Sequence, residues 1–211
     1  MSLFITFEGP EGSGKSTQAT WLAGALQAEG YEVLHTREPG GTPIGEQIRA
    51  VLHDVNNTAM LPTTEILLYS ASRAQLVGEV IRPALARGAV VICDRYATST
   101  LAYQGYGRGL DIQDLRRITE FATGGLQPDL IVYLDLDVAV GLQRKWRDHD
   151  AGKGEWNRMD QQHLDFYQRI REGYLAMSRQ EPGRWHLVDA AQPLEAVRAD
   201  IRRRVDELLP A

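Results

Sequence analysis

Cysteine is nearly absent from this sequence, since Cys93 is the only one among 211 residues. Internal disulfides and zinc sites built from thiolates are therefore excluded, and a reducing compartment is favoured. No apolar run approaches the roughly 20 residues that a membrane helix needs, and the first residues lack the basic start of a secretory signal. With 23 basic and 28 acidic residues, the net charge of −5 provides no overall positive field for a nucleic acid. We therefore expect a single domain over residues 1–211, cytoplasmic, with neither nucleic acid nor membrane as a partner.

Short apolar runs alternate with helical patterns along the chain. Runs such as Val90–Cys93 are apolar on both faces, as strands buried between two layers of helices must be. Alternation of this kind predicts an α/β fold, a parallel sheet with helices on both faces that binds ligands beyond the carboxyl ends of its strands. The expected strands are 3–8, 32–36, 89–94, 130–135 and 185–189, and the expected helices include 63–86, 111–122, 138–146, 159–180 and 194–209, with a further helical stripe formed by Ile44, Ile48, Val51 and Leu52.

A glycine-rich motif directly follows the first expected strand. Its glycines let backbone N–H groups turn inward around phosphate oxygens, and the helix that follows adds its positive end. Lys15 would reach the β- and γ-phosphates of ATP, and the Ser16 hydroxyl would hold Mg²⁺. The expected ATP-binding residues are Gly9, Pro10, Glu11, Gly12, Ser13, Gly14, Lys15, Ser16 and Thr17.

This glycine-rich motif is a P-loop, and a P-loop by itself does not identify the reaction that a protein catalyses. A GTPase switch needs an Asp-x-x-Gly motif and a guanine-reading Asn/Thr-Lys-x-Asp motif, and the sequence contains neither. An ATP-driven motor usually requires a larger chain, so the length of this sequence argues against a motor, though less strongly than the missing motifs argue against a GTPase. A small-molecule kinase is therefore favoured.

Arginines gather near the expected strand ends. Arg37 follows the second strand, and Asp94-Arg95 follows the third. Tyr69 and Arg73 lie four residues apart on one helix face. Each could be an ordinary surface or core residue, but together, beside a P-loop, they predict a second anion site, because the guanidinium fork grips phosphate oxygens in pairs.

The polar segment 147–157 contains two glycines and lies between two expected helices. It is either a surface loop or a mobile lid. The cations Arg144, Lys145, Arg147, Lys153 and Arg158 bracket it. They could form a solvated helix end, or they could close over a transferring phosphoryl group and exclude water. We interpret residues 144–158 as a lid, with Arg144, Arg147 and Arg158 as candidate catalytic residues beside Lys15 and Arg95.

Several segments together resemble the bacterial thymidylate kinase (dTMP kinase) family, a branch of the P-loop nucleoside monophosphate kinases. The resemblance covers nearly the whole chain and is carried by Phe7–Thr17, Thr36-Arg37-Glu38-Pro39-Gly40-Gly41-Thr42, Asp94-Arg95-Tyr96, Ser99–Gly109 and the stretch from Pro128 to Asp135. It implies a five-stranded parallel sheet, a homodimer, and transfer of the γ-phosphoryl group of MgATP to dTMP. The products would be ADP and dTDP, the latter used in the synthesis of dTTP for DNA.

The resemblance also implies roles for individual residues. Arg37 and Arg95 would hold the dTMP phosphate and Glu11 the sugar 3′-hydroxyl, with Asp94 orienting Mg²⁺ through water. Pro39 is similar to a family proline that follows a cis bond. The base and sugar would contact Tyr69, Arg73, Ser99, Thr100, Tyr103 and Gln104, with Tyr69 stacking on thymine, Arg73 bonding its O4 and Tyr103 crowding the 2′ position.

Two features depart from the family pattern: no arginine follows Glu11 in the P-loop, and Asn157-Arg158-Met159-Asp160 stands where relatives often have Asp-Arg-x-Glu.

The acceptor phosphate, with a second pKa of about 6, is largely ionised at neutral pH and needs no general base. Catalysis would then consist of positioning and charge neutralisation. Other hypotheses are a kinase for another nucleoside monophosphate or for a deoxynucleoside, and a nucleotide-binding regulatory module without turnover.

Overall fold

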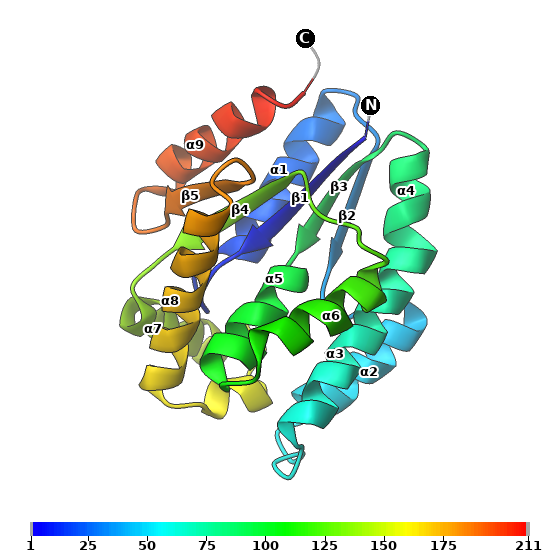
Figure 1. Cartoon of the computed structure of the whole chain (residues 1–211). Coiled ribbons are helices and arrows are strands. Elements are labelled where there is room, and N and C mark those ends of the chain that lie inside the picture. The colour runs from blue at the N-terminus through cyan, green and yellow to red at the C-terminus, as the bar shows by residue number, and fades with distance from the viewer. Residues whose placement is uncertain (1, 210–211) are drawn as a thin grey trace.

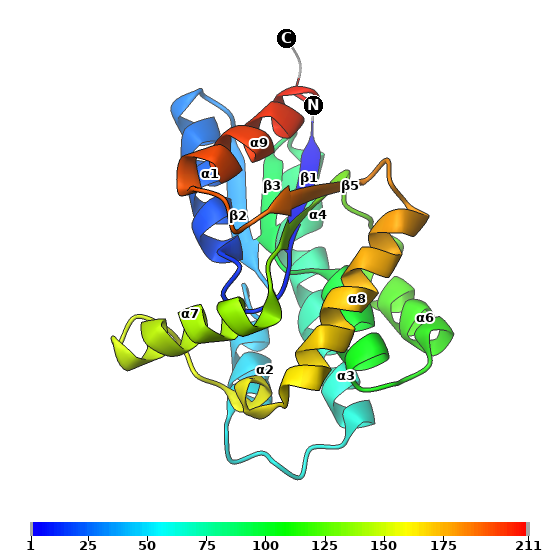
Figure 2. The same cartoon turned by 90° about the vertical axis from the view of Figure 1, so that its left-hand side faces the viewer.

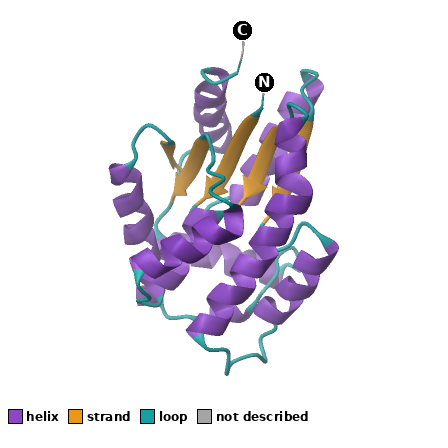
Figure 3. Cartoon of the chain, turned by 45° about the vertical axis from the view of Figure 1, so that its right-hand side comes forward, coloured by secondary structure: helices purple, strands orange, loops and turns teal. Residues whose placement is uncertain are grey.

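A parallel sheet of five strands forms the centre of the fold (Figures 1 and 3). The computed structural model describes residues 2–209. The spatial order of the strands is β2-β3-β1-β4-β5, and Ile5 of the central strand lies opposite Ile92 and Leu130 of its two neighbours. The predicted α/β class with a parallel sheet is confirmed. The strands are β1 (Leu3–Glu8), β2 (Val33–Arg37), β3 (Val90–Asp94), β4 (Leu130–Asp135) and β5 (Trp185–Asp189).

Alternate residues of each strand enter two different cores, because successive side chains of a strand point to opposite faces. On one face, α1 (Lys15–Ala28) and α9 (Leu194–Asp206) pack against residues such as Ile5 and Val132. On the other, neighbours such as Phe4 and Ile131 pack beneath the remaining layer of helices. Both faces are thus covered, which explains the continuous apolar runs of the strands.

The other helices follow the predicted pattern with three differences. One predicted helix, 63–86, consists of α3, the π-helical turn η1 and α4. α7 runs four residues further into the lid than expected, and a 3₁₀ turn, η3, precedes α8, which begins at Leu164 rather than at Met159. No helix among residues 2–209 is long and apolar enough to cross a membrane. These elements are α2 (Pro43–His53), α3 (Pro62–Leu76), η1 (Val77–Ile81), α4 (Arg82–Ala86), α6 (Ile112–Thr123), α7 (Val138–Asp150), η3 (Arg158–Gln161) and α8 (Leu164–Gln180).

A helical stretch after β3 was not predicted. It comprises α5 (Ala97–Thr100) and the π-helical η2 (Leu101–Gly107). Glycines weaken its helical pattern, yet they are required for packing. A Cβ at Gly105 would lie 2.3 Å from Ile112 of α6, and one at Gly107 would lie 2.6 Å from Phe166 of α8.

The predicted stripe on α2 is helical, but only Leu52 of it is fully buried. Ile44 and Val51 are exposed, and so are Leu67 of α3 and Phe121 of α6, the last with 90% of its surface accessible. The three helices pack in sequence, α2 on α3 and α3 on α6, and lie side by side in Figure 1. Each of α2, α3 and α6 therefore exposes apolar side chains on its surface.

Candidate active site

The P-loop connects β1 to α1 at the carboxyl edge of the sheet. Gly9, Gly12 and Gly14 have positive φ angles of 148°, 66° and 89°. A Cβ at Gly12 would lie 2.0 Å from the carbonyl oxygen of Gly141, so no larger residue fits there. The Lys15 ammonium lies inside this loop and donates to the carbonyl oxygen of Pro10 at 2.8 Å.

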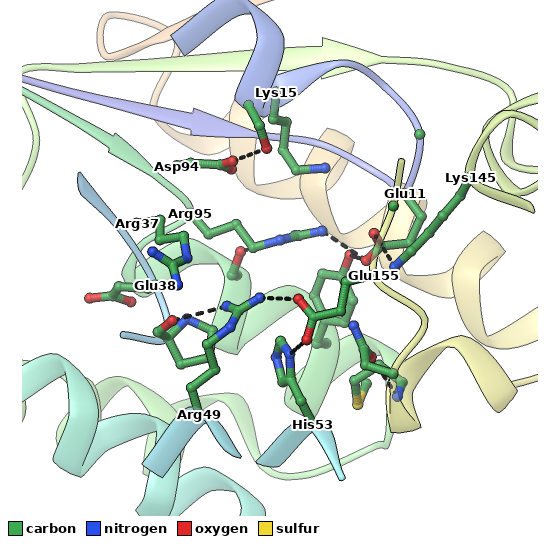
Figure 4. A pocket seen from close by; sticks show the side chains of 18 of the residues that line it. Glu11, Lys15, Arg37, Glu38, Arg49, His53, Asp94, Arg95, Lys145 and Glu155 are labelled. Carbon is green, nitrogen blue, oxygen red and sulfur yellow. Dashed lines mark hydrogen bonds and ion pairs between the residues drawn. The ribbon is translucent and has the colours of Figure 1, made fainter. Parts of the chain in front are cut away.

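Ser16 and Asp94 meet where α1 and β3 approach each other. The Ser16 hydroxyl donates to Oδ2 of Asp94 (Figure 4), whereas Oδ1 of Asp94 is buried without a partner. An unpaired carboxylate oxygen beside a hydroxyl suits a hard cation such as Mg²⁺. Within residues 2–209, no cluster of three or more His, Cys, Asp or Glu side chains that could hold a metal exists.

Glu8 organises the loop that follows β3. Its buried carboxylate accepts hydrogen bonds from the Tyr96 amide at 2.9 Å, the Thr98 and Ser99 hydroxyls at 2.6 Å each, and the Tyr174 hydroxyl at 2.7 Å. The sequence reasoning missed this role, because three of the donors lie 88 to 91 residues from Glu8 along the chain and the fourth lies 166 residues from it.

Arg95 occupies the centre of the site (Figure 4). Its φ of 69° is the one positive value among non-glycine residues that the structure describes, and such strain is typical of functional positions. The guanidinium lies over the Tyr103 ring at 4.9 Å and pairs with Glu11 at 2.8 Å. Tyr103 also donates to Glu11, at 2.8 Å.

Glu11 is further held by Lys145 of α7, at 3.3 Å, and Lys145 bonds Asp160 at 2.5 Å. Burial by itself would raise the pKa of Glu11, but Arg95, Lys145 and Lys15 outweigh it and hold that pKa well below its usual range. Glu11 is therefore a carboxylate at neutral pH.

Arg73 is buried, with only 2% of its surface exposed. It donates to Glu38 through Nε at 2.8 Å, to the Thr100 hydroxyl through Nη1 at 2.9 Å, and to the carbonyl oxygen of Tyr96 at 3.2 Å. The bond between Glu38 and Pro39 is cis, as the resemblance implied. Arg73 is thus a fixed donor at the floor of the site.

A cavity of about 450 Å³ joins these groups, a volume that suits a small ligand. Tyr69, from α3, lines it, and burial raises the pKa of this phenol to about 12. The predicted site residues that line this cavity are Glu11, Gly12, Gly14, Lys15, Ser16, Thr17, Arg37, Tyr69, Arg73, Asp94, Arg95, Ser99, Thr100, Tyr103 and Gln104.

Arg144 and Arg147 line a second cavity, of about 530 Å³, on which the P-loop residues Gly12, Ser13, Gly14, Thr17 and Gln18 also border. Nη1 of Arg144 donates to the carbonyl oxygen of Ala190 at 3.3 Å, beyond the end of β5. These two arginines therefore lie beside the P-loop, apart from the cavity that Arg37 and Arg73 line.

Arg158 lines neither cavity. It pairs with buried Glu65 at 2.5 Å and donates to the carbonyl oxygen of Leu52 at 3.1 Å. Lys153 does line the first cavity, and within residues 2–209 its ammonium has no ion pair or hydrogen bond. The sequence identified Lys153 as one of five lid cations but did not distinguish it from the others.

The segment 144–158 contacts α2 through Glu155, an interaction that the sequence did not reveal. The Glu155 carboxylate pairs with Arg49 at 2.5 Å and contacts Nδ1 of His53 at 2.7 Å (Figure 4). Burial, followed by the charge of Arg49, lowers the pKa of His53, so the imidazole is neutral at pH 7. In Figure 2, α7 extends away from the sheet, and the chain after it returns toward α2.

The fold and the site together define a P-loop NTPase of the nucleotide kinase type: one cavity runs from a P-loop lysine to a set of arginines, of which Arg73 is buried. The family model described as "Thymidylate kinase" matches residues 7–201. The chain belongs to the thymidylate kinase family.

Individual relatives agree with this assignment. A thymidylate kinase from Roseiflexus castenholzii is 54% identical, with 99% of this chain and 95% of that one covered. The thymidylate kinase from Deinococcus radiodurans is 52% identical, with 97% of each chain covered. The crystal structure of thymidylate kinase from Ehrlichia chaffeensis is similar with a TM-score of 0.78 at 30% identity, and 97% of this chain and 98% of that one are covered.

Proposed function

We propose that this protein transfers the γ-phosphoryl group of ATP to dTMP and thereby forms ADP and dTDP for the synthesis of dTTP. The observation that carries the proposal is the continuous cavity that joins Lys15 to Arg37, Arg95 and Arg73. Family membership over nearly the whole chain supports the same reaction.

The donor would bind at the P-loop. Backbone N–H groups of the P-loop, where Pro10 alone has none to offer, would surround its phosphates, and Lys15 would turn from the Pro10 carbonyl to the β- and γ-phosphates. Mg²⁺, held by Ser16 directly and by Asp94 through water, would neutralise phosphate charge when bound. The second cavity, between the P-loop and Ala190, has the position to take the nucleoside part of ATP.

The acceptor would bind in the first cavity. Arg37, Arg95 and Ser99 face the phosphate, and Glu11 with Tyr103 borders the sugar. Tyr69 stacks on the thymine ring, while Arg73, Thr100 and Gln104 meet its edge. Because the acceptor phosphate is already ionised, these residues position it and need not remove a proton.

Residues 144–158 would act as the lid of this single domain. Arg144 and Arg147 reach the donor from the second cavity, and Lys153 approaches the transferring group from the first. Arg158, paired with Glu65, anchors the end of the lid. A closed lid excludes water, which would otherwise compete as an acceptor.

The decisive experiment is ADP release with MgATP against dTMP, dUMP, dCMP, dGMP, AMP and thymidine. We expect strong preference for dTMP, loss of turnover with EDTA and recovery with added Mg²⁺. Turnover with thymidine alone would indicate a deoxynucleoside kinase, and nucleotide binding without turnover would indicate a regulatory module. Either result would refute the proposal.

We also propose a homodimer formed through the apolar surface of α2, α3 and α6, together with a cytoplasmic location that suits one free, buried cysteine. Leu67→Glu, which places a charge in this surface, is expected to yield monomers in light scattering. Val140→Glu, on exposed α7, is the matched control and should remain dimeric. A wild-type monomer at micromolar concentration would contradict the dimer.

A further inference from the structure

The amide of Gln104 is held in one orientation. Gln104 lies on η2 with 2% of its surface exposed, and its Nε2 donates to Oε1 of Glu65 at 2.8 Å. The Oε1 atom of Gln104 accepts no hydrogen bond from residues 2–209, and it is not completely buried. Since Gln104 lines the first cavity, this oxygen is available to a ligand there.

Glu65 determines this orientation because it is an ionised carboxylate. Only 1% of its surface is exposed, and it accepts bonds from Arg108 at 2.7 and 2.8 Å and from Arg158 at 2.5 Å. Burial by itself would raise the pKa of Glu65, but the bonds from Arg108, Gln104 and Arg158 lower it below its ordinary value. A carboxylate can only accept hydrogen bonds, so the NH₂ group of Gln104 must face it and the carbonyl oxygen must turn away.

A donor is fixed beside this acceptor. Arg73 bonds Thr100, which precedes Gln104 by four residues on the same helical segment, and Glu38 holds the guanidinium in place. Arg73, Thr100 and Gln104 all line the first cavity, which therefore offers a donor from Arg73 and an acceptor from Gln104.

The donor of Arg73 and the acceptor of Gln104 complement the hydrogen-bonding edge of thymine and are mismatched with that of cytosine. Thymine presents an acceptor at O4 and a donor at N3–H, whereas cytosine presents a donor at N4 and an acceptor at N3. Cytosine would place donor against donor and acceptor against acceptor. A site built for one hydrogen-bond pattern rejects the reversed pattern strongly, because its buried groups are left unpaired.

We propose that Glu65 is a positioning residue that sets the choice of thymine over cytosine by holding the Gln104 carbonyl oxygen toward the base. The inference rests on the proposed function. Glu65 itself lines neither cavity, so it acts only through Gln104.

Glu65→Gln tests this directly. An amide at position 65 can donate as well as accept, so the amide of Gln104 becomes free to rotate and to present its NH₂ group to the base. We expect the ratio of kcat/KM for dTMP to that for dCMP to fall by roughly tenfold to a hundredfold, the cost of one mismatched hydrogen bond.

Arg108→Met is the matched control. It removes two of the hydrogen bonds to Glu65 but leaves the bond from Gln104, and Arg108 lines neither cavity. Arg158 still bonds Glu65 in this variant and favours its ionised form, so Glu65 remains an acceptor for Gln104. We expect a lower Tm and an unchanged dTMP/dCMP ratio. In the background of Gln104→Leu, Glu65→Gln should change the ratio no further, because the group through which Glu65 acts is gone.

An unchanged ratio in folded Glu65→Gln, or an equal fall in Arg108→Met, would overturn the inference and leave Glu65 a structural residue. If Glu65→Gln does not fold, NMR of the wild-type enzyme decides. We expect the side-chain NH₂ of Gln104 to stay protected from exchange and to shift little when dTMP binds, whereas a large shift with loss of protection would overturn the inference. Failure of the wild-type enzyme to phosphorylate dTMP would instead refute the proposed function.

Discussion

Lys15→Ala is expected to lower kcat by roughly a thousandfold, because this ammonium is the cation that the P-loop directs at the phosphates of the donor. Lys15 lines the first cavity and is buried by the P-loop, so water screens its charge poorly. The measurement is ADP release at saturating MgATP and dTMP.

The same substitution should leave the fold intact. Burial, followed by the charge of Arg95, lowers the pKa of Lys15 to about 8 from its ordinary 10.5. Because the pKa is lower in the folded state than in the unfolded chain, the charged form destabilises the fold increasingly as the pH falls from 10.5 to about 8, and the full cost is present at pH 7. Removing the ammonium therefore removes this cost, and the Tm of the variant at pH 7 should equal or exceed that of the wild type.

Arg203→Ala provides the control for Lys15→Ala. Arg203 is an exposed cation on α9 whose ion pair within residues 2–209 is with neighbouring Asp200, so its loss should change neither kcat nor Tm appreciably. A Lys15→Ala enzyme with a normal Tm and more than a tenth of the wild-type kcat would contradict the role of Lys15.

Arg95→Ala is expected to lower kcat/KM for dTMP by roughly a hundredfold to a thousandfold, while the KM for ATP changes little. The guanidinium lines the acceptor side of the cavity, stacked on Tyr103 and paired with Glu11. Its removal takes away a phosphate partner and leaves Glu11 with Lys145 as its remaining ion-pair partner. Loss of a charged partner in a shielded site costs several times more than loss of an exposed one.

Arg95→Lys separates charge from geometry. Lysine keeps the positive charge but cannot grip two phosphate oxygens in one plane, so we expect recovery of only part of the loss. The left-handed backbone at this position already carries a side chain with a Cβ, so neither variant adds strain of that kind. Unchanged kcat and KM for dTMP in Arg95→Ala would refute its role at the acceptor.

Elements with strong local patterns were predicted well from the sequence. Three strands, 3–8, 130–135 and 185–189, have the predicted bounds, because apolar runs between turn residues specify buried strands. The start of α8 was placed five residues too early, since Gln162 and His163 have extended backbones that the helical period does not show. The segment 97–107 was missed because its glycines serve contacts with α6 and α8 that are distant in sequence.

The sequence by itself determined the order of the strands and of most helices, the P-loop, and many of the residues that line the first cavity, since each depends on a local pattern or on a family segment. Only the tertiary structure decided which charges meet. Arg158 pairs with Glu65, 93 residues away, and Glu155 pairs with Arg49, 106 residues away. Such pairs depend on how α7 and the lid return across the sheet edge, and no spacing along the chain encodes that path. For the same reason, the carboxylate that orients Gln104 became visible only when α3 and η2 were placed together.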